Sequence, residues 1–120
     1  LVDSSAHIIG EYLFDRDRMI LELLSSSDKI WERRIAIIAT HYFIRKKDFS
    51  TTFVISEKLL GDCHDLIHKA VGWSLREVGK KDKQALVDFL TRFSKNMPRT
   101  ALRYAIEHFS DAERKSIMAR

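Results

Sequence analysis

Apolar side chains recur along this chain at the three- and four-residue spacing of amphipathic helices. Almost no stretch shows the period of two that marks a β-strand, and the chain contains one proline and four glycines. The pattern predicts helices near residues 3–14, 16–25, 28–46, 51–60, 63–78, 83–94, 98–108 and 111–118. The sequence therefore predicts an all-α protein.

Residue types that begin or end helices stand between these stretches. Ser27, Asp62, Asp82 and Ser110 are the expected N-caps, the last in a capping box with Glu113; Ser50 precedes a helix, Pro98 suits a first turn, and Gly61 and Gly79 are expected to end helices. The joints are short, and no Ser/Gly-rich linker divides the chain. We expect one domain over residues 1–120, built as an α-solenoid or superhelix of HEAT-like helical repeats, with a compact helical bundle as the alternative.

Composition says more about the cellular compartment of the protein than about its function. Lys and Arg exceed Asp and Glu by 21 to 17, a mild excess that permits a nucleic-acid partner without demanding one. Cys63 is the single cysteine, so no internal disulfide can form and a reducing cytoplasm fits best. No apolar run approaches the ~18 residues of a membrane span, and no signal peptide is recognisable. We expect a cytoplasmic protein with no membrane partner.

The expected helix 63–78, with the residues just after it, carries a tryptophan within a basic stripe. At about 100° per residue, four side chains fall within roughly 60° of each other. They are Lys69, Trp73, Arg76 and Lys80. An indole among cations suits a partner that bears aromatic rings and phosphates, although a core role for Trp73 is the ordinary alternative. Gly72, inside the helix, indicates close approach of a neighbouring helix or a ligand.

The expected helix 28–46 has a mostly buried composition, with Trp31 among its apolar residues. Arg34, His41 and Arg45 share a polar stripe on it. Arg34 lies three residues from Trp31, so the two side chains can meet. Its guanidinium either pairs with a carboxylate or reaches toward a phosphate.

Two basic clusters, residues 45–47 and 80–83, lie at helix ends. Favourable interaction with helix dipoles explains them. If the helical hairpins stack in parallel order, both clusters also lie on one rim and can line a phosphate backbone.

No cofactor and no metal is expected. His64 and His68 have the spacing of two metal ligands, but the glutamate and third ligand of a zinc protease are missing.

Asp3, followed by two serines, reads by itself as a helix N-cap.

Four separated segments resemble motifs of one family in the same order, the bacterial DNA alkylation repair proteins of the AlkD type. Residues 1–10 resemble its segment WDLVDSSAPHIVG, and residues 30–36 resemble its helix WxRRxA. Residues 65–80 are similar to DxxVQKAxGWxLREVGK, and residues 97–107 to MPRTxLRYAIE. The resemblance covers nearly the whole chain.

This resemblance implies a HEAT-like solenoid whose concave face holds double-stranded DNA. It also implies a glycosylase that removes N3- or N7-alkylated purines without a cofactor. Asp3 matches the family's catalytic aspartate, Arg34 its cleft arginine and Trp73 a cleft tryptophan. Lys69, Arg76, Lys80 and Arg45 are expected to complete the DNA-binding cleft.

The resemblance also contains a departure. The family carries a second cleft tryptophan four residues before the aspartate, and this chain begins two residues before Asp3. We therefore expect a C-terminal part of a longer protein, inactive or nearly so on its own and weak in DNA binding. A non-catalytic nucleic-acid-binding member and a protein-binding scaffold are the alternative functions.

Overall fold

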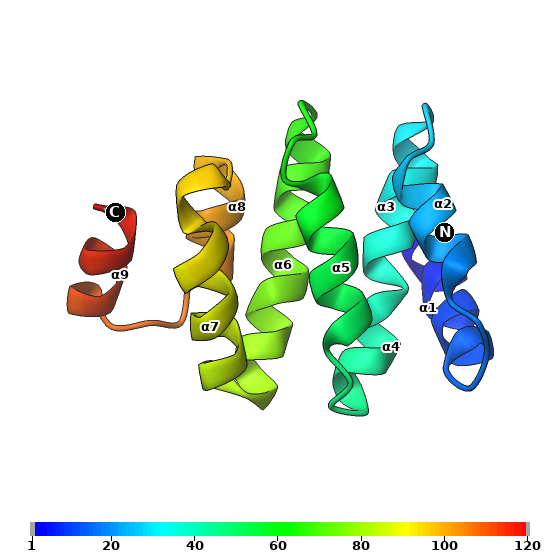
Figure 1. Ribbon diagram of the computed structural model, residues 1–120, viewed down its shortest axis with the longest axis horizontal. Helices are drawn as coiled ribbons and strands as arrows, with labels where there is room; N and C mark the ends of the chain where they lie inside the picture. Colours follow the sequence, from blue (N-terminus) through cyan, green and yellow to red (C-terminus); the bar gives the residue numbers. More distant parts are fainter. Residues whose placement is uncertain (1, 120) are drawn as a thin grey trace.

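The computed structural model describes residues 2–119, and throughout this range the regular structure is helical, without a strand (Figure 1). The all-α prediction is confirmed. The helices are α1 (Val2–Leu13), α2 (Met19–Ser25), α3 (Ile30–Ile38), α4 (Thr40–Arg45), α5 (Ser50–Leu59), α6 (Asp65–Lys81), α7 (Lys83–Phe93), the 3₁₀ turn η1 (Ser94–Asn96), α8 (Arg99–Ala105) and α9 (Asp111–Met118).

The helices stand side by side along the longest axis of a molecule measuring 39 × 29 × 24 Å (Figure 1). They form two layers, with α2, α5 and α7 in front of α3, α4, α6 and α8. Helix α1 lies at one end of the row and α9 at the other. Helix α6 is central, since it packs against α3, α4, α5, α7 and α8.

The core runs between the two layers, and α6 illustrates how the sequence builds it. Ile67, Val71, Leu75 and Val78 recur every three or four residues, and none is more than 1% exposed. Full burial of such a side chain contributes roughly 1.5–3 kcal/mol. The positions on the opposite side of this helix are left to face a groove.

The single helix expected over residues 28–46 is two helices, α3 and α4, which meet at Ala39. The Thr40 hydroxyl donates to the Ile37 carbonyl at 2.6 Å, taking up a backbone acceptor. Helix α1 also crosses here at close range, because a Cβ added to Gly10 would lie 2.2 Å from the Ala39 carbonyl oxygen. Trp31 is 54% exposed and does not belong to the buried face.

The expectation that Gly79 ends a helix is wrong. Helix α6 continues through Gly79 to Lys81. A Cβ at Gly79 would lie 2.6 Å from Leu86 Cδ2, so the glycine permits close packing of α7. Asp82 adopts an extended conformation, ends α6, and caps α7 by accepting from the Ala85 N–H, as predicted.

Among the other expected caps, the box of Ser110 and Glu113 is confirmed. Ser27 and Asp62 are not the N-caps themselves; each lies two residues before the N-cap and accepts a hydrogen bond from its backbone N–H. Ser27 accepts from the N–H of Lys29, which is the N-cap of α3. Asp62 accepts from the N–H of His64, which is the N-cap of α6.

Two other helix limits differ from the expected ones. Helix α2 begins at Met19 rather than residue 16, because Asp17 accepts from the Met19 N–H and holds a turn. Helix α8 begins after Pro98, its N-cap, and ends at Ala105 instead of residue 108.

Candidate nucleic-acid interface

Asp3 and Arg34 form a two-point ion pair between α1 and α3. Arg34 Nε lies 3.1 Å from Asp3 Oδ1, and Nη2 lies 3.2 Å from Oδ2. The Asp3 side chain remains 48% exposed, whereas that of Arg34 is 19% exposed. Of the two roles open to Arg34, carboxylate pairing is therefore present, and it fixes the plane of a carboxylate that solvent still reaches.

A groove of about 280 Å³ lies beside this pair, between α6 and α8. Its polar and aromatic lining consists of Arg34, Lys69, Trp73, Arg76 and Tyr104. Below it is called the tryptophan groove. Trp73 is only partly buried and also packs on the core. The indole therefore packs on the core and also lines the groove, and its contact with a partner stays a prediction.

Each cation that lines the tryptophan groove is ion-paired. Arg34 pairs with Asp3, and Lys69 Nζ lies 3.2 Å from Asp65 Oδ2. Arg76 pairs with Glu107 of the segment following α8. All three carboxylates are well exposed, so a phosphate can displace them without leaving a buried charge.

His41 packs edge-on against Trp73, with ring centroids 4.4 Å apart. Its Nε2 lies 2.8 Å from Ser74 Oγ. Because the Ser74 hydroxyl already donates to the Ala70 carbonyl at 2.9 Å, Nε2–H is the donor to Ser74. Burial lowers the pKa of His41 from 6.5 to about 4, so the imidazole next to Trp73 is neutral at physiological pH.

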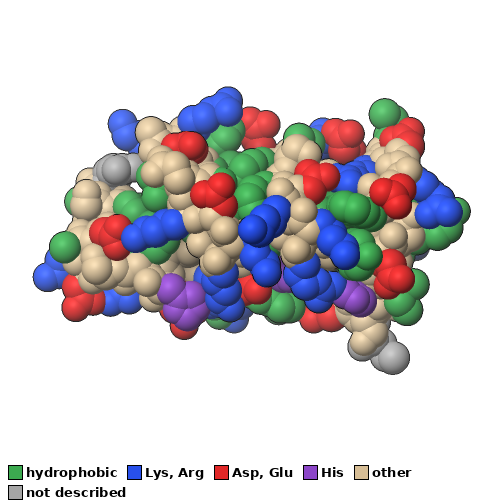
Figure 2. Space-filling view, turned by 90° about the horizontal axis from the view of Figure 1, so that it is seen from below, with side chains coloured by type: hydrophobic (Ala, Val, Ile, Leu, Met, Phe, Trp, Pro, Cys, Tyr) green, Lys and Arg blue, Asp and Glu red, His purple; other side chains and the backbone are tan. Residues whose placement is uncertain are grey.

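A second groove, of about 290 Å³, lies where α4 and α6 end. Arg45, Glu77, Lys80 and Lys81 line it together with His41. Viewed from below, Lys and Arg side chains gather across the middle of this end of the molecule (Figure 2). We call this second groove the basic groove. The two basic clusters of the sequence thus do contribute to one surface.

The expected stripe of Lys69, Trp73, Arg76 and Lys80 is divided between the two grooves. The first three side chains line the tryptophan groove, whereas Lys80 lines the basic groove and pairs with Glu77 at 2.9 Å. Arg45 joins Lys80 there, with its guanidinium 2.7 Å from His7 Nδ1. The structure thereby brings every expected cleft residue to two adjoining grooves that share the His41–Trp73 contact.

Gly72 lies where α8 packs closely against α6. A Cβ at this position would lie 2.5 Å from Tyr104 Cβ and 2.6 Å from the Ala101 carbonyl oxygen. The glycine therefore allows α8 to approach α6 and brings Tyr104 into the tryptophan groove. Sequence reasoning missed Tyr104, although the segment 97–107 that contains it was one of the four with a family resemblance.

The two histidines with metal-ligand spacing serve the local backbone. His64 Nδ1 accepts from the Leu66 N–H at 3.2 Å, and the ring of His68 contacts the Asp62 carbonyl. No group of three or more His, Cys, Asp or Glu side chains placed to hold a metal ion occurs among residues 2–119.

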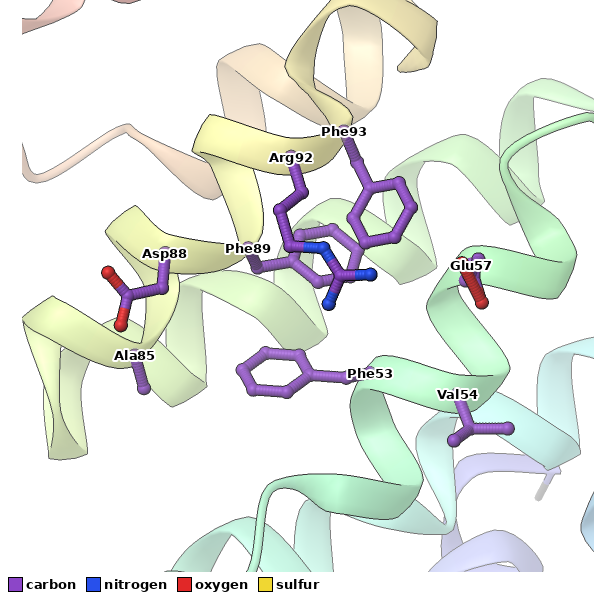
Figure 3. A pocket seen from close by; sticks show the side chains of 8 residues that line it. All are labelled: Phe53, Val54, Glu57, Ala85, Asp88, Phe89, Arg92 and Phe93. Carbon is purple, nitrogen blue, oxygen red and sulfur yellow. The ribbon is translucent and has the colours of Figure 1, made fainter.

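A third groove, of about 350 Å³, opens on the other layer between α5 and α7 (Figure 3). Its rings are Phe53, Phe89 and Phe93, with Phe53 and Phe89 stacked at 5.1 Å. Arg92 lies over the Phe93 ring at 5.0 Å. Below it is called the phenylalanine groove.

A family model described as DNA alkylation repair enzyme matches residues 1–109, which include both candidate grooves. The chain belongs to the DNA alkylation repair enzyme family. No curated protein and no solved structure matches it. Membership in this family implies a DNA substrate. Within residues 2–119, every helix is too short or too polar to cross a lipid bilayer.

Proposed function

We propose that this chain carries the site of an alkylpurine DNA glycosylase, which hydrolyses the N-glycosidic bond of N3- or N7-alkylated purines. One observation carries the proposal beyond family membership. An exposed carboxylate, Asp3, is oriented by Arg34, and the same arginine lines the groove of Trp73. A carboxylate, a cation and an indole are thus collected at one edge of a cationic surface.

The alkylated purine is already cationic and therefore a good leaving group. As the glycosidic bond breaks, positive charge builds on the deoxyribose. In the proposed mechanism the Asp3 carboxylate stabilises this charge and orients the attacking water, from which it can accept a proton. Arg34 holds the carboxylate in one orientation, so little reorganisation is needed in the transition state.

Trp73 is proposed to contact the cationic base or the sugar through its π-face. The neutral state of His41 suits this role, because a protonated imidazole beside the indole would repel a cationic base. The edge-on contact of His41 also fixes one edge of the indole.

The remaining cations are proposed to hold the DNA backbone. Lys69 and Arg76 in the tryptophan groove, and Arg45 and Lys80 in the basic groove, lie on adjoining surfaces that duplex phosphates can reach together. For the architecture we propose a HEAT-like α-solenoid. The side-by-side row of helices in two layers supports it (Figure 1).

The decisive experiment is base release from methylated DNA by the whole protein that contains residues 1–120. Asp3→Asn is expected to abolish release of 3-methyladenine or 7-methylguanine while DNA binding persists. Asp88→Asn on α7 is the matched control, because Asp88 lies at the phenylalanine groove. Undiminished release by Asp3→Asn would refute the catalytic role. Salt-sensitive binding without any release would instead indicate a non-catalytic DNA-binding member.

A further inference from the structure

A fourth groove lies between α9 and the C-terminal half of α8 with the residues that follow it, at the end of the row opposite α1 (Figure 1). Its volume is about 390 Å³. We call it the α8–α9 groove, and its lining consists of Arg103, Ile106, Glu107, Arg114, Lys115 and Met118. The family match ends at residue 109, so the wall formed by α9 lies outside the part of the chain that the family model describes.

Contacts at both ends hold α9 in place. In its first turn, Glu113 pairs with Lys83 of α7 at 2.8 Å. At its last residue, the Met118 carbonyl accepts from Arg99 of α8 at 2.7 Å. Ile117 lies between these contacts and is buried. The groove is therefore formed before a ligand arrives, and a ligand need not supply the free energy of ordering α9.

The groove has an apolar floor although most of its lining residues are charged. Ile106 and Met118 supply apolar side chains. Arg103, Arg114 and Lys115 add the aliphatic parts of their side chains, while their charged ends can stay in water. The floor thus suits an apolar side chain, and the rim suits an anion.

Two cations of this rim differ from those of the tryptophan groove. Arg103 and Lys115 are exposed, one on each wall, and neither forms an ion pair within residues 2–119. Arg114 and Glu107 of the same lining are already paired with other residues. An incoming carboxylate therefore gains contacts with Arg103 and Lys115 without displacing a carboxylate of the protein.

We propose that the α8–α9 groove binds an acidic amphipathic helix of a partner protein. An apolar side chain of that helix lies on the floor at Ile106 and Met118, and its carboxylates contact Arg103 and Lys115. Amphipathic helices bind other proteins by placing their apolar face in such a groove, and complementary charges at the rim set their orientation. A DNA backbone would use the two cations but gain nothing from the apolar floor. This inference goes beyond the proposed glycosylase and does not depend on it.

The probe is a fluorescein-labelled synthetic helical peptide of about 14 residues, or four turns. Leucines spaced by three and four residues form one face of the peptide, and glutamates flank them. We expect saturable binding to the whole protein that contains residues 1–120, measured by fluorescence anisotropy. Replacing the leucines by alanine, or the glutamates by lysine, should each lower the affinity by about tenfold or more.

A double variant, Arg103→Gln with Lys115→Gln, removes both rim charges. Both side chains are exposed, so the variant should fold normally. We expect it to bind the acidic peptide about tenfold more weakly, with unchanged duplex DNA affinity and base release. The matched control, Arg92→Gln with Lys95→Gln, removes two exposed cations outside the groove and should bind the peptide like the wild type.

The outcomes separate this inference from other occupants of the groove. Equal affinity of the wild type and the rim variant for the acidic peptide, or equal binding of the acidic and basic peptides, would overturn it. Weaker duplex binding by the rim variant, without peptide binding by the wild type, would assign the groove to DNA. Self-association that the rim variant abolishes, again without peptide binding, would assign it to a second copy of this chain. Base release by Asp3→Asn is a separate measurement, so either proposal can fail alone.

Discussion

The tryptophan groove and the phenylalanine groove are both lined by aromatic rings, yet they differ in how those rings are used. In the phenylalanine groove the rings contact one another, with Phe89 only 4% exposed between Phe53 and Phe93 (Figure 3). In the tryptophan groove Trp73 and Tyr104 face a space bordered by three ion-paired cations. The rings of one groove are therefore packed on one another, whereas those of the other are left beside cations that a ligand can reach.

The comparison predicts that Phe89 matters for stability and not for DNA. Phe89→Ala should lower the free energy of unfolding by about 3–5 kcal/mol, because it opens a cavity between the layers. The Kd of the remaining folded protein for DNA should be unchanged. Urea unfolding and fluorescence anisotropy measure the two quantities. Trp73→Ala is the counterpart, expected to weaken DNA binding by about 1–3 kcal/mol. A weaker Kd for folded Phe89→Ala would break the comparison.

His41, which packs against Trp73, makes the stability of the folded protein depend on pH. Its pKa of about 4 in the folded protein lies below its ordinary value of 6.5. Between these values the unfolded chain binds a proton that the folded chain does not. Stability is therefore complete above pH 6.5 and falls toward pH 4, by at most about 3 kcal/mol.

His41→Gln should flatten this profile. Unfolding measured from pH 6.5 to pH 5.5 tests it above the range, around pH 4, where most carboxylates titrate. Equal slopes for the two proteins would mean that another group is responsible.

Alanine substitutions at two glycines test the packing of α8 against α6, one at the contact and one as a control. Gly72→Ala places a methyl group 2.6 Å from the Ala101 carbonyl oxygen, so α8 must move and take Tyr104 with it. We expect a loss of about 1–3 kcal/mol of stability. Gly61→Ala meets nothing within 4 Å and should be neutral or slightly stabilising. Thermal melting of both variants decides this, and equal melting temperatures would contradict the close crossing.

The smallest expected effect concerns single charges. Lys80→Gln should reduce the slope of log K against log salt for duplex DNA by about 0.9, as for the loss of one phosphate contact. Arg92→Gln, at the phenylalanine groove, should leave the slope unchanged. Titrations at several salt concentrations compare them. A reduced slope for Arg92→Gln would place DNA on both layers.

The features that the sequence predicted correctly are those determined within one turn of helix. Asp82 and the Ser110–Glu113 box cap their helices through residues three positions away. The features it missed depend on neighbours distant in the chain. Gly79 looked like a helix end because its packing partner on α7 was not known, and the sequence around Ala39 did not reveal that α1 crosses where the helix breaks.

The candidate site shows the same division. Residue types indicated Arg34 and Trp73, and the family resemblance added Asp3, which by itself reads as an N-cap. The distribution of the basic stripe over two grooves required the structure. Tyr104 carried no signal of its own in the sequence, since only the crossing at Gly72 brings it next to Trp73. His41 appeared as one member of a stripe, and its neutral state follows from burial.

In the proposed complex with DNA, the carboxylates paired with Arg34, Lys69 and Arg76 compete with the DNA phosphates for these cations. A phosphate gains its contact only by displacing Asp3, Asp65 or Glu107, so approach to ordinary duplex brings little net attraction at this groove. If DNA binds at this groove as proposed, we expect the competition to weaken its binding to intact duplex.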